Sequence, residues 1–156
     1  SKVWDQKLNR KERRKAIRSA LSASMEKELV GKKHQVPETY PYIIASSFED
    51  ISKTKDVQDA LKKLGLGKEL SRCETKTVRS GKGTMRGRKY RRKVGPLVVV
   101  SKECKLSKAG ANVPGVEILE VNSLNAEALA PGAVPGRLVL FTDKSLEVME
   151  KEKLFL

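Results

Sequence analysis

The sequence predicts an α/β protein with a mostly parallel sheet that is covered by helices on both faces. Four short apolar runs, at residues 42–45, 97–100, 116–121 and 137–142, have the length and the Val, Ile and Leu content of strands. Segments with apolar residues at i, i+3 and i+4 spacing alternate with these runs, as helices do in a parallel α/β fold. The 156 residues suffice for one domain, over residues 1–156, with a core of its own.

The first expected element is a helix over residues 9–30. Asn9 can cap it and Glu12 can reach back to form a capping box, while Gly31 is a natural stop. One face carries apolar residues and the other carries cations: Ile17, Ala20, Leu21, Met25 and Leu29 against Arg10, Lys11, Arg13, Arg14, Lys15 and Arg18. Cations in the first turns oppose the helix dipole. They indicate either a bound anion at this end or a solvated basic face, and the helix alone does not decide between the two.

A short apolar run at 42–45 predicts a buried strand, and a second helix follows it. Thr54 or Ser52 would cap this helix, and Gly65 and Gly67 would end it. Its inner stripe would consist of Val57, Ala60, Leu61 and Leu64. The segment 72–93 then breaks the regular pattern.

The alternation of strands and helices resumes after Pro96. The run 97–100 is typical of a strand that is covered on both faces. A further strand is expected at 116–121, and a short helix from Ser123 or Asn125 through Leu129.

The closing part of the chain predicts one more strand and one more helix. The strand spans 137–142, and Asp143 or Thr142 would cap the last helix, with Leu146, Met149 and Leu154 facing inward. The whole succession favours a Rossmann-like three-layer arrangement.

The net charge of +14 is concentrated in two segments. Residues 1–36, a basic helical arm, hold 11 Lys/Arg and 4 Asp/Glu, a net charge of +7. Residues 72–93 hold 10 Lys/Arg and 1 acid, a net charge of +9, whereas 37–71 and 97–156 each carry −1. This layout is expected of a neutral folded body with two basic attachments to nucleic acid.

The segment 79–93 reads RSGKGTMRGRKYRRK, within a basic loop over 72–96. Glycines let a backbone approach phosphates closely, and arginine offers a planar fork that suits phosphate oxygens. Tyr90, among Lys89, Arg91 and Arg92, offers a stacking face for an unpaired base. Because the segment has too few apolar residues for a core, we expect it to be mobile alone and ordered by RNA.

The sequence provides no recognisable catalytic, metal or cofactor motif. The spacing of Gly81, Gly83 and Gly87 matches neither the dinucleotide fingerprint nor the Walker loop. Cys73 and Cys104 are far apart and outside any C-x-x-C pair, so two reduced thiols are expected. His34, the one histidine, is interpreted as a solvated loop residue because its neighbours are polar. We therefore expect no cofactor, no metal and no small-molecule substrate.

Several motifs in order resemble the universal large-subunit ribosomal protein L-four family, in its archaeal and eukaryotic form. They are WDQKLNRKERRKAIRSALSAS, KTKDVQDALKKLGL, RSGKGTMRGRKYRRKVGPLVVVS and NVPGVEILEVNSLNAEALAPGAVPGRLVLFTDKSL. Members of the family begin with a strand and a helix and a long loop that reaches toward the peptide exit tunnel, and no counterpart is present here. We therefore expect a sheet that is incomplete at its N-terminal edge.

The resemblance implies a structural, non-enzymatic role in the cytoplasmic ribosome. The implied partners are large-subunit ribosomal RNA and neighbouring large-subunit proteins, with no membrane. By position, the RNA-binding role is carried to Arg79, Lys82, Arg86, Arg88, Lys89, Tyr90, Arg91, Arg92 and Lys93, and less directly to Lys11, Arg13 and Arg14.

Two other functions compete with this interpretation. An enzyme would place its site at the carboxyl ends of the strands, where Asp143 lies, but capping of the last helix explains that residue better. A DNA-binding protein would use the helix at 9–30, yet no helix-turn-helix, zinc finger or basic zipper accompanies it.

Overall fold

A four-stranded parallel sheet organises the structure, a computed structural model that describes residues 1–4 and 6–155. Its strands are β1 (Ile43–Ile44), β4 (Leu97–Val100), β5 (Glu117–Glu120) and β6 (Val139–Thr142), in the order β1-β6-β4-β5. Every neighbouring pair is parallel. The predicted α/β class is therefore confirmed, with a sheet that is parallel throughout.

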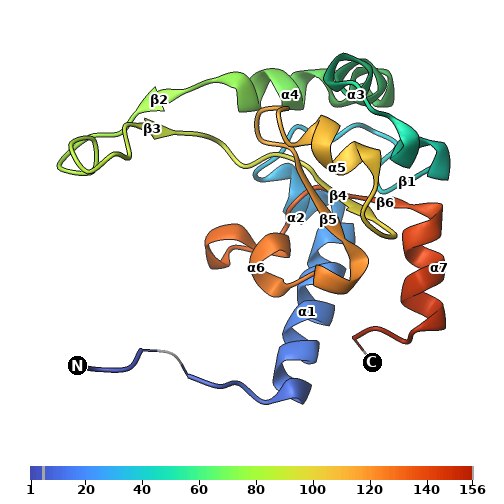
Figure 1. Cartoon of the computed structure of the whole chain (residues 1–156), viewed down its shortest axis with the longest axis horizontal. Helices are drawn as coiled ribbons and strands as arrows, with labels where there is room; N and C mark the ends of the chain where they lie inside the picture. Colours follow the sequence, from blue (N-terminus) through green and yellow to red (C-terminus); the bar gives the residue numbers. More distant parts are fainter. Residues whose placement is uncertain (5, 156) are drawn as a thin grey trace.

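Helices cover both faces of this sheet (Figure 1). Alternate residues of β4 and β6 point to opposite faces, because successive side chains on a strand do so. One core cluster contains Val98 and Leu140, and it is covered by α3 (Thr54–Leu61), α4 (Gly67–Glu74) and α5 (Lys105–Gly110). The other contains Leu97, Val99, Val139 and Phe141, and it is covered by α1 (Arg10–Met25), α6 (Ala126–Leu129) and α7 (Asp143–Lys151).

The N-terminal helix is shorter than predicted and its capping box does not form. The α-helix α1 ends at Met25, Glu26 has an extended backbone, and a separate helix α2 (Lys27–Gly31) follows. Asn9 stands at the N-cap position, but its side chain makes no capping hydrogen bond. Ile17 and Ala20 are buried as expected, whereas Met25 is exposed because the break turns it away from the core.

The second predicted helix also differs in its ends. The N-cap residue of α3 is Lys53 rather than Thr54 or Ser52, and no side chain caps it. Gly65, with a φ of 82°, kinks the π-helical segment η2 (Lys62–Leu66), and the chain continues directly into α4. The predicted helix therefore ends by Gly65, which adopts the left-handed conformation that glycine favours. The helix α4, which begins at Gly67, was not predicted.

In the carboxyl-terminal part of the chain, the capping residues that the sequence predicted are closer to those in the structure. The side chain of Asn125 accepts a hydrogen bond from Ala128 N at 2.8 Å and caps α6. Thr142, not Asp143, caps α7 by accepting from Ser145 N at 3.4 Å. Short 3-10 turns complete the chain at η1 (Ser46–Asp50), η3 (Val121–Ser123) and η4 (Pro131–Ala133), and α5 was not predicted.

The edge strand β1 is less buried than predicted. Ile44 is buried, but Ile43 is 56% exposed. The strand lies at the edge of the sheet beside β6 and has two residues. Only one of its faces is therefore covered, which the apolar composition of the run did not indicate.

A buried arginine, Arg137, links the start of β5 to the residues that precede β4. The guanidinium of Arg137 is almost fully buried. It donates to Gly95 O at 3.1 Å, to Ala128 O at 2.7 Å and to a carboxylate oxygen of Glu117 at 2.7 Å. Because Gly95 leads into β4, Glu117 begins β5 and Ala128 belongs to α6, one side chain links three elements.

We expect the substitution Arg137→Leu to destabilise the protein by about 3 kcal/mol, because two buried carbonyl groups lose their donor. The free energy of unfolding in urea measures the effect. As a control, Lys151→Ala removes an exposed cation 3.4 Å from Glu147 and should cost less than about 0.5 kcal/mol. Equal unfolding midpoints for the two variants would contradict the prediction.

Candidate nucleic-acid interface

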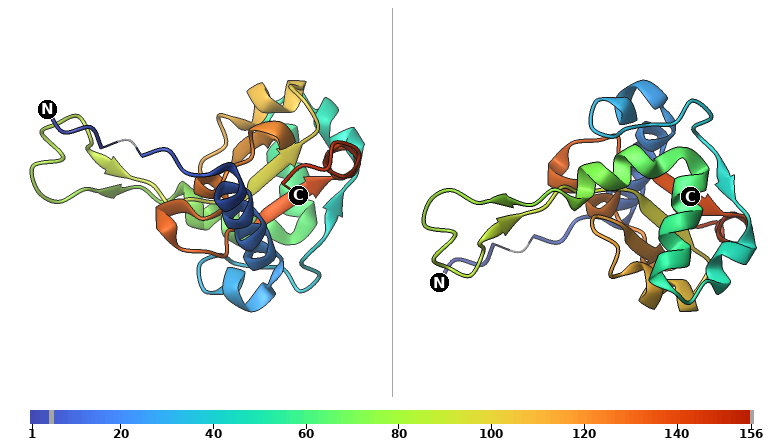
Figure 2. Two further views of the ribbon diagram at one scale, coloured as in Figure 1. Left: turned by 90° about the horizontal axis from the view of Figure 1, so that it is seen from below. Right: turned by 90° about the horizontal axis from the view of Figure 1, so that it is seen from above.

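A two-stranded ribbon projects from the body of the protein (Figures 1 and 2). Its strands are β2 (Thr77–Val78) and β3 (Tyr90–Arg91), which pair antiparallel. Arg79 N extends the pairing by donating to Lys89 O at 2.8 Å. We call residues 75–93 the basic ribbon. It contains nine of the twelve residues that the sequence nominated for RNA binding.

The tip of the basic ribbon is held by its own backbone. Arg88 N donates to Gly83 O at 3.0 Å, and Arg86 N donates to Lys82 O at 3.2 Å. Gly81 and Gly87 have φ values of 79° and 78°, a region that other residues adopt at a cost. The glycines therefore serve the turns of the tip, in addition to any close approach of a ligand.

No residue of the basic ribbon is buried. The sequence-based inference that this segment lacks a core is confirmed. The ribbon nevertheless has a paired stem, which the composition did not predict. Its mobility in the absence of RNA stays a prediction.

Tyr90 lies on the stem of the basic ribbon and not at its tip. The ring is about half exposed. Lys76 Nζ and Lys89 Nζ each lie 5.6 Å from the ring centroid, within the range of a cation–π contact. The ring is thus part of the cationic surface, with a face that is partly accessible.

The root of the basic ribbon is packed so tightly that only glycine fits at two positions. Gly95 N donates to Gly115 O at 2.9 Å. A Cβ at Gly95 would lie 2.7 Å from Cys73 Sγ and 2.8 Å from Gly115 O. Burial raises the pKa of the Cys73 thiol, so this cysteine is a packing residue. Both cysteines are free, as predicted.

The prediction for His34 was wrong, because the residue is buried and bound to a carboxylate. Its Nδ1 lies 2.6 Å from an oxygen of Glu69, whose side chain is also fully buried. The same carboxylate accepts from Arg72 at 2.6 and 2.8 Å and from Gln35 N at 2.9 Å. The polar sequence around His34 concealed a partner that is 35 residues away in the chain.

This cluster, Glu69 with His34 and Arg72, sets the charge of the carboxylate and positions the ribbon. Burial alone would raise the pKa of Glu69, but hydrogen bonds from Arg72, His34 and Gln35 N outweigh it and lower the pKa to about 2. Arg72 also donates to Val94 O at 2.7 Å. Since Val94 is the residue after the ribbon, the carboxylate indirectly fixes the point where the ribbon re-enters the body.

The three remaining nominated residues, Lys11, Arg13 and Arg14, lie at the start of α1 and are exposed. They are well apart from the basic ribbon in Figure 1. Residues 6–9, which precede α1, run toward the same side of the molecule as the ribbon (Figure 2). The structure therefore forms two cationic surfaces and does not merge them into one.

The carboxyl ends of the strands are occupied by a side chain of the protein itself. The helices that follow β4 and β6, α5 and α7, cover opposite faces of the sheet, an arrangement that leaves a crevice between the two strands in many α/β enzymes. Here one carboxylate oxygen of Glu49 accepts from Thr142 Oγ1 at 2.6 Å and from Ser101 N at 3.1 Å, and the other accepts from Ser101 Oγ at 2.9 Å. Asp143 lies nearby, exposed in the first turn of α7.

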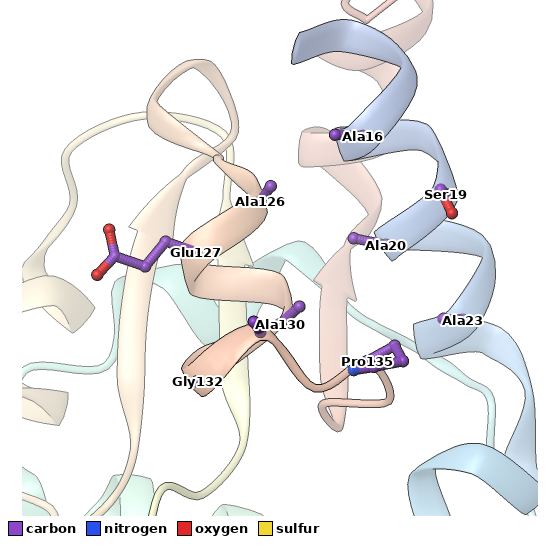
Figure 3. A pocket seen from close by; sticks show the side chains of 10 residues that line it. Ala16, Ser19, Ala20, Ala23, Ala126, Glu127, Ala130, Gly132 and Pro135 are labelled. Atoms are coloured by element: carbon purple, nitrogen blue, oxygen red, sulfur yellow. The ribbon is translucent and has the colours of Figure 1, made fainter. Parts of the chain in front are cut away.

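A hollow between α1 and the α6–η4 segment has a different character (Figure 3). Its volume is about 820 Å³. Small side chains line it: Ala16, Ser19, Ala20, Ala23, Ala126, Ala130 and Ala133, with Glu127, Gly132 and Pro135. No cation lines it, so it does not extend the basic surfaces.

Other kinds of site find little support in the residues that the structure describes. No group of three His, Cys, Asp or Glu residues among them is placed to hold a metal ion. No helix in the described part is long and apolar enough to cross a membrane.

Comparisons with known proteins find relatives that match nearly the whole chain. The family model described as "Ribosomal protein L4/L1 family" matches residues 1–152. The large ribosomal subunit protein uL4 of Nanoarchaeum equitans is 46% identical over 155 residues, which cover 99% of this chain and 58% of that protein.

Two further archaeal proteins of the same name show similar matches. That of Methanosphaera stadtmanae is 42% identical over 93% of this chain and 58% of its own length. That of Methanocaldococcus jannaschii is 42% identical over 96% of this chain and 60% of its own length. The chain thus spans about three fifths of the length of the curated relatives that it matches.

The stability of the protein should depend on the ionised state of Glu69. Its usual pKa of 4.5 falls to about 2 in the folded protein, so folding favours the ionised form. This contribution, on the order of 3 kcal/mol, is present above pH 4.5 and is lost as the pH falls from 4.5 toward 2.

The measurement compares urea unfolding of the natural protein and Glu69→Gln between pH 7 and pH 3. We expect the difference in unfolding free energy to narrow below pH 4.5. Glu147→Gln, at an exposed carboxylate, serves as the control and should show a small difference throughout. If the difference in unfolding free energy between the natural protein and Glu69→Gln stays constant down to pH 3, the ionised carboxylate does not have the stabilising role assigned to it.

Proposed function

Because the chain belongs to the ribosomal protein L4/L1 family, we propose that it acts as a structural, non-enzymatic component of the large ribosomal subunit. Its curated relatives carry the name of a large-subunit protein. The proposed partners are large-subunit ribosomal RNA and neighbouring large-subunit proteins, and the proposed location is the cytoplasmic ribosome. Residues 1–156 serve as one RNA-binding unit, with a basic helical arm at 1–36 and a basic loop at 72–96.

The observation that carries the proposal is the basic ribbon. Residues 72–93 hold ten Lys/Arg and one acid. The ribbon part of this segment, 75–93, leaves the body as a paired stem and contains no buried residue. Such a concentration of exposed cations repels itself, and a polyanion offsets this repulsion. RNA phosphates provide the charge, at a spacing that an extended ribbon can follow.

The ribbon residues differ in what they contribute to RNA binding. Arg79, Lys82, Arg86, Arg88, Lys89, Arg91, Arg92 and Lys93 supply phosphate contacts, and Tyr90 on the stem supplies a surface for stacking. Phosphate contacts dominate, because ribosomal RNA is recognised largely by its shape. Binding therefore weakens as salt rises, since each neutralised phosphate releases counterions.

The start of α1 provides a second contact. Lys11, Arg13 and Arg14 lie in the first turns of the helix, where the positive end of the helix dipole disfavours cations. Glu12 is the acidic residue in the first turn. An RNA phosphate at this end stabilises the arrangement, so we assign these three residues to RNA as well.

The predicted incomplete edge of the sheet also belongs to the proposal. The strands β1 and β5 form the two edges, and Ile43 on β1 exposes an apolar side chain. A further strand beside β1 would pair with its open backbone edge and complete the Rossmann-like arrangement.

A nucleotide-using enzyme on the same scaffold is a weaker alternative. Glu49 already takes up the backbone and hydroxyl donors between β4 and β6, and these are the groups that such an enzyme presents to its ligand. A carboxylate at this position also repels the phosphates of a nucleotide. The architecture therefore favours a binding protein.

The proposal predicts that Arg86→Ala, Arg88→Ala, Arg91→Ala and Arg92→Ala together weaken RNA binding on the order of 100-fold or more, because several charge-assisted contacts are lost. Filter binding to archaeal large-subunit ribosomal RNA measures the affinity over a range of salt concentrations. The salt slope should also fall by up to about 4, one unit for each lost phosphate contact. The melting temperature should change little, since none of the four side chains is buried.

A matched control removes four exposed lysines that lie outside both basic segments. They are Lys102, Lys105, Lys108 and Lys151. Their replacement by Ala causes the same loss of net charge, and we expect less than a tenfold effect on affinity. RNA affinity that the four arginine substitutions leave unchanged, or equal affinity for duplex DNA in competition, would overturn the proposal.

A further inference from the structure

A groove at the root of the basic ribbon holds a second concentration of cations. It lies between the ribbon, the residues after α2 and the turn η4, and its volume is about 680 Å³. Six cationic residues line it: Lys33, Arg72, Arg79, Arg91, Arg92 and Lys93. No acidic residue is among the residues that line it; the others are His34, Thr75, Thr77, Val94, Pro131 and Gly132. Three of the cationic and polar residues, Lys33, His34 and Arg72, lie outside the ribbon.

The groove differs from the ribbon tip because its central donor is fixed. Nε and Nη2 of Arg72 both bind the buried carboxylate of Glu69, and Nη2 also donates to Val94 O. The second terminal nitrogen, Nη1, has no acceptor within the described part of the chain. The guanidinium thus keeps one nitrogen for a ligand while its plane is held by the protein, which lowers the entropy lost on binding.

Lys33 is positioned in a similar way on the opposite wall. Its Nζ donates to Val134 O at 2.7 Å, which ties the chain after α2 to the segment after η4. An ammonium has three protons, so two remain for other acceptors. Lys33 is half-buried, and burial lowers the pKa of its ammonium from the usual 10.5.

The histidine ring adds a polar atom to the floor of the groove. Its Nδ1 faces Glu69, and no partner for Nε2 is found among the described residues. No buried polar side-chain atom of those residues lacks a partner, so Nε2 must reach the surface. His34 is among the residues that line the groove, so its ring contributes to the polar lining.

We infer that this groove is a preformed binding site for the sugar–phosphate backbone of RNA, separate from the contacts of the ribbon tip. Arg72 and Lys33 hold a phosphate from two walls, and Arg92 and Lys93 add charge from the ribbon. The pocket is large enough for a nucleotide unit, since ligand sites commonly measure roughly 300–1,000 Å³. The inference rests on the proposed function and identifies a part of the RNA site that the sequence did not indicate.

The lining distinguishes this groove from the neighbouring hollow. Gly132 of η4 borders both. On one side of the turn the lining is cationic, and on the other side it consists mainly of alanine (Figure 3). A nucleic-acid backbone is attracted to the cationic side alone, so the proposed path of RNA runs along the ribbon and ends at η4.

The test compares two triple variants in binding to archaeal large-subunit ribosomal RNA. The groove variant carries Lys33→Ala, Arg92→Ala and Lys93→Ala, and the tip variant carries Lys82→Ala, Arg86→Ala and Arg88→Ala. A charge-matched control carries Lys102→Ala, Lys105→Ala and Lys108→Ala. We expect the groove variant to lose at least tenfold in affinity and up to about 3 units of salt slope, with the control near the natural protein.

Combining the groove and tip variants shows whether the two sites are separate. Independent sites on one RNA predict that the two losses in binding free energy add. A groove variant that binds like the control, while the tip variant is impaired, would sink this inference and leave the proposed function standing. If neither variant is impaired, the proposed function itself fails.

Arg72→Lys gives a further readout, because it keeps the charge and removes the fork that Glu69 holds. We expect RNA affinity to fall severalfold while the salt slope stays within about one unit of the natural value. Its melting temperature is measured first. If this variant does not fold, the groove variant, which leaves the buried carboxylate and its four donor groups intact, decides the question alone.

Discussion

The buried carboxylate of Glu69 connects the segments to which RNA binding is assigned in the proposed function. It accepts hydrogen bonds from His34 and Gln35, which follow α2, and from Arg72, which continues to Val94 at the end of the basic ribbon. The ribbon has no core of its own. Its direction therefore depends on this root, where an ionised carboxylate is retained because four donor groups offset the cost of its burial.

The parallel sheet explains why such a root exists. Its central strands, β4 and β6, are buried on both faces, so the helices and their connections lie outside the sheet and meet at its ends. At the carboxyl ends, Glu49 closes the crevice between β4 and β6 by hydrogen bonding to both. At the amino ends of the strands, Gly95 and Gly115 pack closely together, and Arg137 hydrogen bonds to Gly95 just before β4. The sheet and its helices thus support the cationic segments, and Glu49 fills the crevice between β4 and β6 where many α/β enzymes bind a ligand.

The separation of charge is the physical link between the scaffold and its proposed partner. A body with balanced charge folds without strong self-repulsion, while the ribbon and the start of α1 carry the excess into solvent. Cations on a projecting ribbon attract a polyanion over about a Debye length. In the proposed complex, the fixed donor Arg72 in the groove favours a definite geometry, which mobile lysines alone do not provide.

Features with a local cause were predictable from the sequence by itself. The strand 97–100 and the concentration of cations over 72–93 follow from neighbouring residues, and the structure contains both. The sequence narrowed the caps of α6 and α7 to two candidates each, and Asn125 and Thr142 are the ones in place. Features that need a distant partner were decided only by the tertiary structure. His34 was assigned to solvent because Glu69 is 35 positions away. The helix α4, which begins at Gly67 and packs against the core through Leu70, was not predicted. The groove belongs to this second group, since its walls come from segments near residues 33, 72, 92 and 132. A buried ion pair depends on which segments the fold brings together, and no local pattern of residues encodes that.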